Sequence, residues 1–212
     1  MTPEQALSAG ITDLGIQVDG KAQPTLLEYL ALLEKWNRTH NLTAIRGMDR
    51  MVSHHLLDSL AVLPHLFQGS KQRLIDIGSG GGLPGIPIAI VRADWDVTLL
   101  DSSHKKTAFL RQATIDLDLP NVRVVNARVE EYHPDQRFEL VLSRAFSDLS
   151  TFATSGRRLL ERGGWLVAMK GAYPHAEIDQ IPSGLRIVDV PVLRIPGLDA
   201  QRHLVILEDA AA

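Results

Sequence analysis

The sequence contains no cysteine, and this absence removes several kinds of chemistry. Without a thiol the chain can form no disulfide, offer no thiolate nucleophile and hold no cysteine-ligated zinc or iron–sulfur cluster. Long apolar runs are missing as well, since no stretch approaches about 18 uninterrupted apolar residues. The opening residues, from Met1 to Gln5, have neither the basic start nor the apolar run of a signal peptide. We therefore expect a cytosolic (cytoplasmic) protein that does not enter a membrane.

A surplus of basic residues is also lacking, because 22 Lys and Arg stand against 25 Asp and Glu, a formal net charge of −3. Proteins held to nucleic acid mainly through phosphate contacts usually carry a basic excess, so composition alone does not indicate an RNA partner. The apolar share of 45% over 212 residues suffices for one packed domain of ordinary size with a short appended lobe.

Apolar residues recur at helical spacing within residues 1–70, which predicts an N-terminal helical lobe over that range. Thr2 is expected to cap a first helix with Pro3 in its first turn, and Pro24-Thr25 to precede a second helix. Asp49 is the expected N-cap of a third. The apolar positions of the second and third helices are Leu26, Leu30 and Leu33, then Val52, Leu56, Leu60 and Leu63.

Residues 71–212 change to short apolar runs separated by helical segments, which predicts a parallel sheet of the α/β class. The expected strands are 73–77, 97–101, 122–126, 138–143 and 165–170. Two further runs, 185–193 and 203–208, leave no room for a helix between them, so they are expected to pair antiparallel. Five parallel strands plus an antiparallel pair resemble the Rossmann-like sheet of class I S-adenosylmethionine (SAM)-dependent methyltransferases.

The strongest local pattern is the glycine-rich run from Asp76 to Gly85, which follows the first expected strand. Glycines there let the backbone turn sharply and let a ligand approach the N–H groups of the following helix. Two interpretations fit. Gly80-x-Gly82-x-x-Gly85 satisfies the dinucleotide fingerprint, whereas Asp76-x-Gly78-x-Gly80-x-Gly82 satisfies the SAM signature. Because the strand ends at Ile77, the turn should begin at Gly78, which favours SAM over a nicotinamide cofactor.

The second expected strand ends at Asp101, where a carboxylate can accept both hydroxyls of a ribose. Alternatively, Asp101 caps the helix that starts near Ser103. Lys105 and Lys106 open that helix and form either a solvated face or part of a cofactor or phosphate site. Ligands of open α/β sheets lie at the carboxyl ends of strands, so residues 126–130 and 143–146 should face the same cleft.

The residues after the fourth expected strand limit the kinds of chemical group that could accept the methyl group. Enzymes that methylate an exocyclic amino group usually carry Asn/Asp-Pro-Pro-Tyr/Phe there, but this chain has Ser143-Arg144-Ala145-Phe146. Carbon-5 of a pyrimidine needs a cysteine adduct and unreactive carbons a radical cluster, so both are excluded. Two kinds of acceptor remain: a hydroxyl that a base deprotonates, or an atom with an available lone pair, such as guanine N7. Arg144 has the chemistry to bind guanine O6, although a structural Arg–carboxylate pair is the alternative.

Taken together, these residues closely resemble the RsmG (GidB) family, the bacterial 16S ribosomal RNA guanine-N7 methyltransferases. The shared motifs are Trp36-Asn37, Asn41-Leu42-Thr43-Ala44-Ile45, His54-His55-x-x-Asp58-Ser59, Asp76-Ile77-Gly78-Ser79-Gly80, Leu83-Pro84-Gly85-Ile86-Pro87, Asp101-Ser102, Lys105-Lys106, Phe109-Leu110, Arg128-Val129-Glu130, Ser143-Arg144-Ala145, Lys170-Gly171 and Arg202-His203. Two departures are mild, since Gly81 stands where relatives vary and Leu83 replaces the commoner Phe.

The resemblance implies transfer of a methyl group from SAM to N7 of one guanine in the decoding-centre loop of 16S rRNA. The partner is then 16S rRNA or the small ribosomal subunit, and Arg144 is the expected catalytic residue. Lys170 and Arg202 are the expected RNA contacts, because they fall near strand ends close to the cleft. The expected cofactor contacts are Gly78, Gly80, Leu83, Asp101, Ser102, Val129, Glu130 and Arg144.

His54 and His55 resemble metal ligands, but adjacent helical positions point about 100° apart and no third ligand is evident, so we expect no metal. Trp36 is expected in the core rather than as a stacking platform, at helical spacing from Tyr29 and Leu33. Two alternatives stay open: a nicotinamide oxidoreductase, and a non-catalytic RNA-binding module that retains the fold without turnover. The intact set of Asp76, Gly78, Gly80 and Asp101 argues against the second.

Overall fold

A computed structural model describes residues 1–66, 69, 71–144, 146 and 148–210. In chain order the elements are α1 (Pro3–Asp13), α2 (Ala22–His40), α3 (Met48–Met51), the π-helix η1 (Val52–Leu57), α4 (Asp58–Leu60), the 3₁₀ turn η2 (Leu63–His65), β1 (Arg73–Ile77), α5 (Gly85–Val91), β2 (Asp96–Asp101), α6 (His104–Asp116), β3 (Val122–Asn126), the 3₁₀ turn η3 (Val129–Glu131), β4 (Phe138–Ser143), α7 (Leu149–Arg157), β5 (Leu160–Lys170), α8 (His175–Ile178), β6 (Leu185–Asp189) and β7 (His203–Asp209).

The strands form one seven-stranded sheet in the order β3-β2-β1-β4-β5-β7-β6. Strands β1 to β5 are parallel, β7 runs antiparallel to β5, and β6 pairs antiparallel with β7. The predicted five parallel strands and antiparallel pair are therefore confirmed. The expected strand 185–193 is shorter than predicted and ends at Asp189, because Pro191 has no N–H to continue the ladder.

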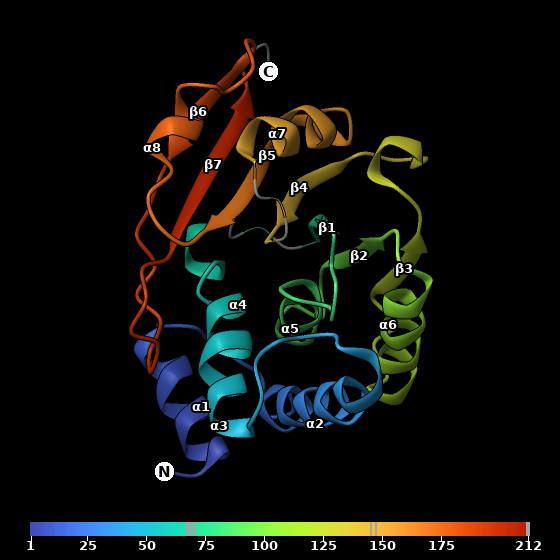
Figure 1. Cartoon of the computed structure of the whole chain (residues 1–212), viewed down its shortest axis with the longest axis vertical. Coiled ribbons are helices and arrows are strands. Elements are labelled where there is room, and N and C mark those ends of the chain that lie inside the picture. The colour runs from blue at the N-terminus through green and yellow to red at the C-terminus, as the bar shows by residue number, and fades with distance from the viewer. Residues whose placement is uncertain (67–68, 70, 145, 147, 211–212) are drawn as a thin grey trace.

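Two apolar cores occupy opposite faces of the sheet. Alternate residues of β1 enter different cores, Leu74 the larger one and Ile75 the smaller one. The larger core gathers α5, α6 and the N-terminal helices, while α7 and α8 pack on the other face (Figure 1). Because both faces are covered, nearly every residue of the central strands β1, β2 and β4 is buried, rather than every second one.

The N-terminal helices do not form a separate core. Helix α2 packs on α5 and α6, and its Leu26, Leu30 and Leu33 join the larger core of the sheet. Trp36 packs against the same core as predicted, with its ring 5.6 Å from that of Phe109. The expected division between 1–70 and 71–212 stays a prediction, and Ser70 at that boundary lies outside the described residues.

The starts of the N-terminal helices agree only partly with the sequence analysis. Thr2 caps α1 in a capping box with Gln5, as predicted for the first helix. Helix α2 begins earlier than predicted, at Ala22, because Pro24 is tolerated in a first turn whose N–H groups have no helical partner. Asp49 is not an N-cap: Gly47, at φ +86°, occupies that position, and Asp49 lies in the first turn of α3.

In the part of the chain that the structure describes, no helix combines the length and the apolar character needed to cross a bilayer.

Candidate functional site: two clefts at the carboxyl ends of the strands

The glycine-rich loop turns where the sequence predicted. The N–H groups of Gly78 and Ser79 both donate to the Leu100 carbonyl, at 2.8 and 3.1 Å, so the chain leaves β1 at Gly78. Gly78, Gly80 and Gly82 have φ values of +72°, +59° and +91°, which explains glycine at each position. A Cβ on Gly85 would lie 2.3 Å from Leu99 Cδ2, so α5 packs against β2 only because no side chain intervenes.

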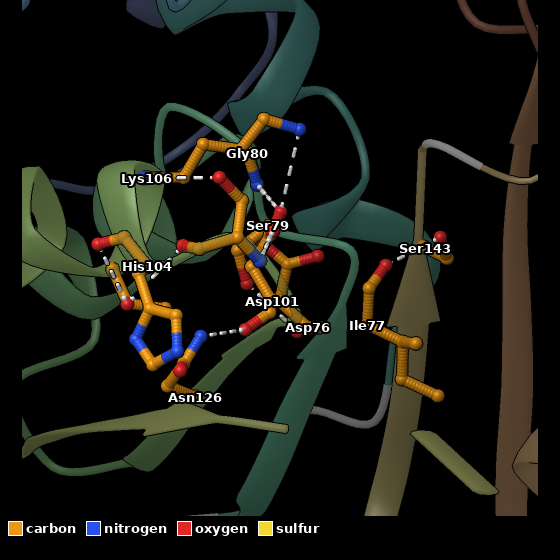
Figure 2. A network of polar contacts seen from close by, with 11 residues as sticks. Asp76, Ile77, Ser79, Gly80, Asp101, His104, Lys106, Asn126 and Ser143 are labelled. Atoms are coloured by element: carbon orange, nitrogen blue, oxygen red, sulfur yellow. Dashed lines mark hydrogen bonds and ion pairs between the residues drawn. The ribbon is translucent and has the colours of Figure 1, made fainter. Parts of the chain in front are cut away.

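Asp101, at the end of β2, ties this loop to the next helix (Figure 2). Its Oδ2 accepts a hydrogen bond from the Gly80 N–H at 2.9 Å, and its Oδ1 accepts one from the Ser103 N–H at 2.9 Å. Lys106 Nζ lies 3.6 Å from Oδ2. The N-cap of α6 is Ser103, whose side chain accepts from the Lys106 N–H, so the alternative role of Asp101 as N-cap is wrong.

A cleft of about 260 Å³ opens beside Asp101, and we call it the Asp101 cleft. It brings together five of the eight expected cofactor contacts. Its lining residues are Ile77, Gly78, Leu100, Asp101, Ser102, Lys106, Ala127, Arg128, Val129, Glu130 and Phe146.

Gly80, Leu83 and Arg144, the remaining expected cofactor contacts, do not line the Asp101 cleft. Gly80 acts through its N–H on Asp101. The Leu83 side chain is 4% exposed and packs in the larger core, because an apolar side chain at the buried start of α5 gains more there than in a polar cleft. Arg144 lies in a second cleft.

That second cleft, which we call the Arg144 cleft, has a volume of about 440 Å³. It brings together Arg144, the expected catalytic residue and cofactor contact, and Lys170 and Arg202, the expected RNA contacts. Its lining residues are Thr43, Ala44, Ile45, His54, His55, Asp58, Arg144, Met169, Lys170, Gly171 and Arg202. Arg144 lines this cleft and Phe146 lines the Asp101 cleft, so the two clefts flank the segment after β4; Ala145 between them lies outside the described residues.

The wall of the Arg144 cleft contains a buried carboxylate to which the sequence analysis gave no role. Asp58 is 2% exposed, and its Oδ2 lies 3.3 Å from Arg144 Nη1 while its Oδ1 accepts from Arg202 Nε at 2.9 Å. An Arg144–carboxylate pair, the alternative that the sequence left open, is therefore present. The sequence did carry a sign of this role: Asp58 stands at helical spacing from His54, and apolar residues flank it at Leu56, Leu57 and Leu60.

Comparison with known proteins decides the family. A family model described as rRNA small subunit methyltransferase G matches residues 22–205. The chain belongs to that family. A ribosomal RNA small subunit methyltransferase G of Chromobacterium violaceum is 54% identical, covering 94% of this chain and 94% of that protein. One of Laribacter hongkongensis is 51% identical over 97% of this chain and 98% of that protein. The predicted resemblance is confirmed.

Solved structures agree on the fold. A SAM-dependent methyltransferase from Aquifex aeolicus matches with a TM-score of 0.61 at 15% identity, over 82% of this chain and 97% of that chain. The predicted class I methyltransferase fold is confirmed. Of the two patterns that the glycine-rich loop satisfies, the SAM signature is the one that agrees with membership of a methyltransferase family.

In this member of the methyltransferase G family, His55 is held neutral within the Arg144 cleft. Its Nδ1 lies 3.0 Å from the His54 carbonyl, and Nε2 lies 2.9 Å from the Thr43 hydroxyl. A carbonyl only accepts, so Nδ1 carries the proton and Nε2 accepts from Thr43. Burial, reinforced by the charge of Arg144, lowers the pKa of His55 to about 4. Among the described residues, no three His, Asp or Glu side chains are grouped to hold a metal ion.

Lys170 lies at the Arg144 cleft but its ammonium is already engaged. Nζ lies 2.7 Å from Glu177 Oε2 and donates to the Phe146 carbonyl at 3.3 Å, and the side chain is 9% exposed. The same Glu177 oxygen accepts from the Leu149 N–H. Lys170 therefore joins β5 to α7 and α8 in this structure, and its expected contact with RNA stays a prediction.

Tyr29 is a second residue that the sequence analysis did not assign to the site. It is fully buried in α2, and its hydroxyl donates to the Gly81 carbonyl at 2.5 Å. Burial raises its pKa, so the phenol stays protonated and able to donate. The N-terminal helices thus hold the glycine-rich loop directly, a contact between positions 52 residues apart that no local pattern indicates.

We expect Tyr29→Phe to weaken the loop without emptying the core. Losing the donor to a buried carbonyl should lower the free energy of unfolding by about 1–3 kcal/mol and the affinity for S-adenosylhomocysteine a few-fold. Chemical denaturation and calorimetry measure the two. Tyr173→Phe, at a tyrosine 38% exposed, is the matched control and should change neither. Wild-type values for Tyr29→Phe would contradict the role.

Asp76 predicts a pH dependence of stability. Its carboxyl is fully buried, which raises its pKa from 3.8 to about 7, although the Gly85 N–H donates to Oδ2 at 3.0 Å. The folded state therefore keeps a proton that the unfolded chain releases, so this group makes the unfolding free energy fall as pH rises from about 4 to 7.

Asp76→Asn should remove that slope. Between pH 5 and 8 the unfolding free energy of the variant should fall less than that of the wild type, by on the order of 2 kcal/mol. Urea titrations at four pH values measure this. Asp94→Asn, at an exposed carboxyl paired with Arg92, should retain the wild-type slope. Parallel pH profiles for wild type and Asp76→Asn would refute the assignment.

Proposed function

We propose that the chain transfers a methyl group from SAM to N7 of one guanine in the decoding-centre loop of 16S rRNA. The observation that carries the proposal is the position of Arg144. It follows β4, in the cleft next to the Asp101 cleft, where a base would meet a methyl group presented from the cofactor side. Family membership supplies the coarser statement, an rRNA methyltransferase of the small subunit.

The Asp101 cleft suits the nucleoside half of SAM. Each carboxylate oxygen of Asp101 already accepts one backbone N–H, which fixes its orientation. A carboxylate has about four lone-pair sites, so two remain for the two ribose hydroxyls. Val129 and Glu130 of η3 line the same cleft and suit contact with adenine. When bound, SAM supplies a methyl group on a sulfonium, which needs no proton transfer to become electrophilic.

The Arg144 cleft suits an acceptor that is already nucleophilic. His55 is neutral, but its Nε2 is occupied by Thr43, so it is not poised to take a proton from a substrate. Guanine N7 offers a lone pair and requires only alignment with the methyl group. Among the described residues, Arg144 donates one N–H to Asp58. A guanidinium has five N–H donors, so others remain for guanine O6.

The movement of charge during methyl transfer favours a contact of Arg144 with guanine O6 rather than with N7. Positive charge moves from sulfur to the purine during the reaction, so a cation placed at N7 would oppose it. At O6 the same guanidinium fixes the base in the plane of the ring without facing the new charge. Arg144 would then act by positioning.

The test is mass analysis of 16S rRNA after incubation of purified protein, SAM and small subunits from cells that lack this gene. We expect one added methyl, on a guanine of the decoding-centre loop, and the strand cleavage at that nucleotide that follows alkaline opening of the N7-methylguanine ring. Naked 16S rRNA should be a weaker substrate, because the chain has no basic excess to hold phosphates. Since binding to naked RNA would then depend on phosphate contacts alone, its methylation should be strongly salt-dependent. Methyl on another atom, or none with any ribosomal substrate, would refute the proposal.

A further inference from the structure

Asp58 is the one carboxylate among the described residues that line the Arg144 cleft, and it is both buried and shared by two arginines. It is 2% exposed at the start of α4, whereas the side chains of its two arginine partners are 29% and 27% exposed. The guanidiniums therefore form part of the cleft wall and the carboxylate lies behind them. Burying a charge is costly unless it is paired, and here each oxygen holds one arginine.

The three partners come from distant parts of the chain. Asp58 follows the π-helix η1, Arg144 follows β4 and Arg202 precedes β7. Helices α3, η1 and α4 form one rod beside the sheet (Figure 1). Asp58 lines the same cleft as Arg144, which follows β4, and Lys170, which ends β5. The N-terminal helices thus contribute a charged group to the cleft rather than only an apolar cover.

The charge of Asp58 also matters for a reaction that places a cation on the base. Arg144 and Arg202 together carry two positive charges, and Asp58 cancels one of them. His55 adds none while neutral, and Lys170 is paired with Glu177. The wall of the cleft can therefore present several donors to a guanine without an accumulation of positive charge around it.

We propose that Asp58 is a positioning residue for methyl transfer: it holds Arg144 and Arg202 as a fixed pair and so sets where the acceptor base lies. The inference rests on the proposed function. A guanidinium on a long side chain has many rotamers, and a bond at each carboxylate oxygen restricts both arginines before the substrate arrives. If that restriction is lost, the rate of methyl transfer within the enzyme–substrate complex should fall more than the affinity of the enzyme for its substrate.

The experiment compares Asp58→Asn with wild type in steady-state methylation of small subunits, together with calorimetric binding of S-adenosylhomocysteine. We expect kcat to fall roughly 10- to 100-fold, and KM for the subunit and Kd for S-adenosylhomocysteine to change less than about threefold. Glu139→Gln is the matched control. It removes the charge from the Arg73–Glu139 ion pair, which lies at the amino ends of the strands, away from both clefts. The side chain of Arg73 is about as exposed as those of Arg144 and Arg202, so kcat should stay within about twofold of the wild-type value.

If Asp58→Asn folds poorly, a second pair of variants can still test whether Asp58 acts through its arginine partners. Arg144→Gln and the double variant Asp58→Asn/Arg144→Gln avoid the unpaired guanidinium that Asp58→Asn alone would leave on Arg144. If Asp58 acts through its two arginines, adding Asp58→Asn to Arg144→Gln should lower kcat by clearly less than the same change does in the wild-type background, because only the hold on Arg202 is left to lose.

The outcomes separate the hypotheses. A lower melting temperature with wild-type kcat for Asp58→Asn would make Asp58 a purely structural link and overturn the inference. Fully multiplied effects in the double variant would show that Asp58 does not act through Arg144, and this would overturn the inference that it fixes the two arginines as a pair. Absence of turnover by the wild-type protein would instead refute the proposed function, whatever the variants show.

Discussion

Replacing Arg144 by alanine is expected to slow methyl transfer roughly 10²-fold, the scale that follows misplacement of reacting groups. The side chain lies at the end of β4 beside the acceptor site, and its free donors suit guanine O6. Binding of S-adenosylhomocysteine should change much less, because Arg144 does not line the Asp101 cleft. Tritiated methyl incorporation into undermethylated small subunits measures the rate.

Arg144→Ala should also lower the stability of the fold. Measuring rate and stability together separates a catalytic role of Arg144 from a structural ion pair with Asp58. Without Arg144, the buried Asp58 carboxylate keeps Arg202 as its one ionic partner among the described residues, so we expect a loss of about 1–3 kcal/mol in the free energy of unfolding. Arg123→Ala, at an exposed arginine of β3, is the control and should alter neither rate nor stability. Near-normal methyl incorporation by folded Arg144→Ala would contradict the catalytic role and leave only the ion pair with Asp58.

The elements that sequence predicted well are those with strong local patterns. Five apolar runs separated by helical segments specify a parallel sheet, and the register of the glycine-rich loop at Gly78 follows from where β1 ends. Asp101 was placed for the same reason, since carboxyl ends of neighbouring parallel strands meet at one edge. These features depend on residues a few positions apart.

The contacts that sequence did not predict join distant residues. Asp58 meets Arg144 across 86 positions and Arg202 across 144, and these pairs exist only once the helical rod lies against the sheet. The π-helix η1 was also unforeseen, because its apolar spacing resembles that of an α-helix. The side chain of Leu83 lies in the core because burial decides the position of an apolar side chain, and the cofactor contact expected of Leu83 from family resemblance stays a prediction.

Asp101→Ala is expected to lower the affinity for S-adenosylhomocysteine at least about tenfold, and nearer a hundredfold if both ribose contacts are lost. Charge-assisted hydrogen bonds contribute roughly 1.5–3 kcal/mol each before non-additivity. The structure adds a second cause, because the Gly80 and Ser103 N–H groups lose their shared acceptor and the glycine-rich loop loses its anchor. Isothermal calorimetry measures the affinity, and the melting temperature without ligand reports folding.

Lys106→Met distinguishes the carboxylate from its ionic partner. Lys106 Nζ lies 3.6 Å from Asp101 and its side chain is 42% exposed, so the pair is of the weakly stabilising surface kind. If Asp101 acts by holding ribose and the glycine-rich loop, Lys106→Met should change the affinity less than about threefold. Equal losses in both variants would mean that the charge pair, rather than the hydrogen bonds of Asp101, governs binding. Unchanged affinity in Asp101→Ala would exclude Asp101 from the ribose site, because no other described carboxylate at the end of β2 could replace it.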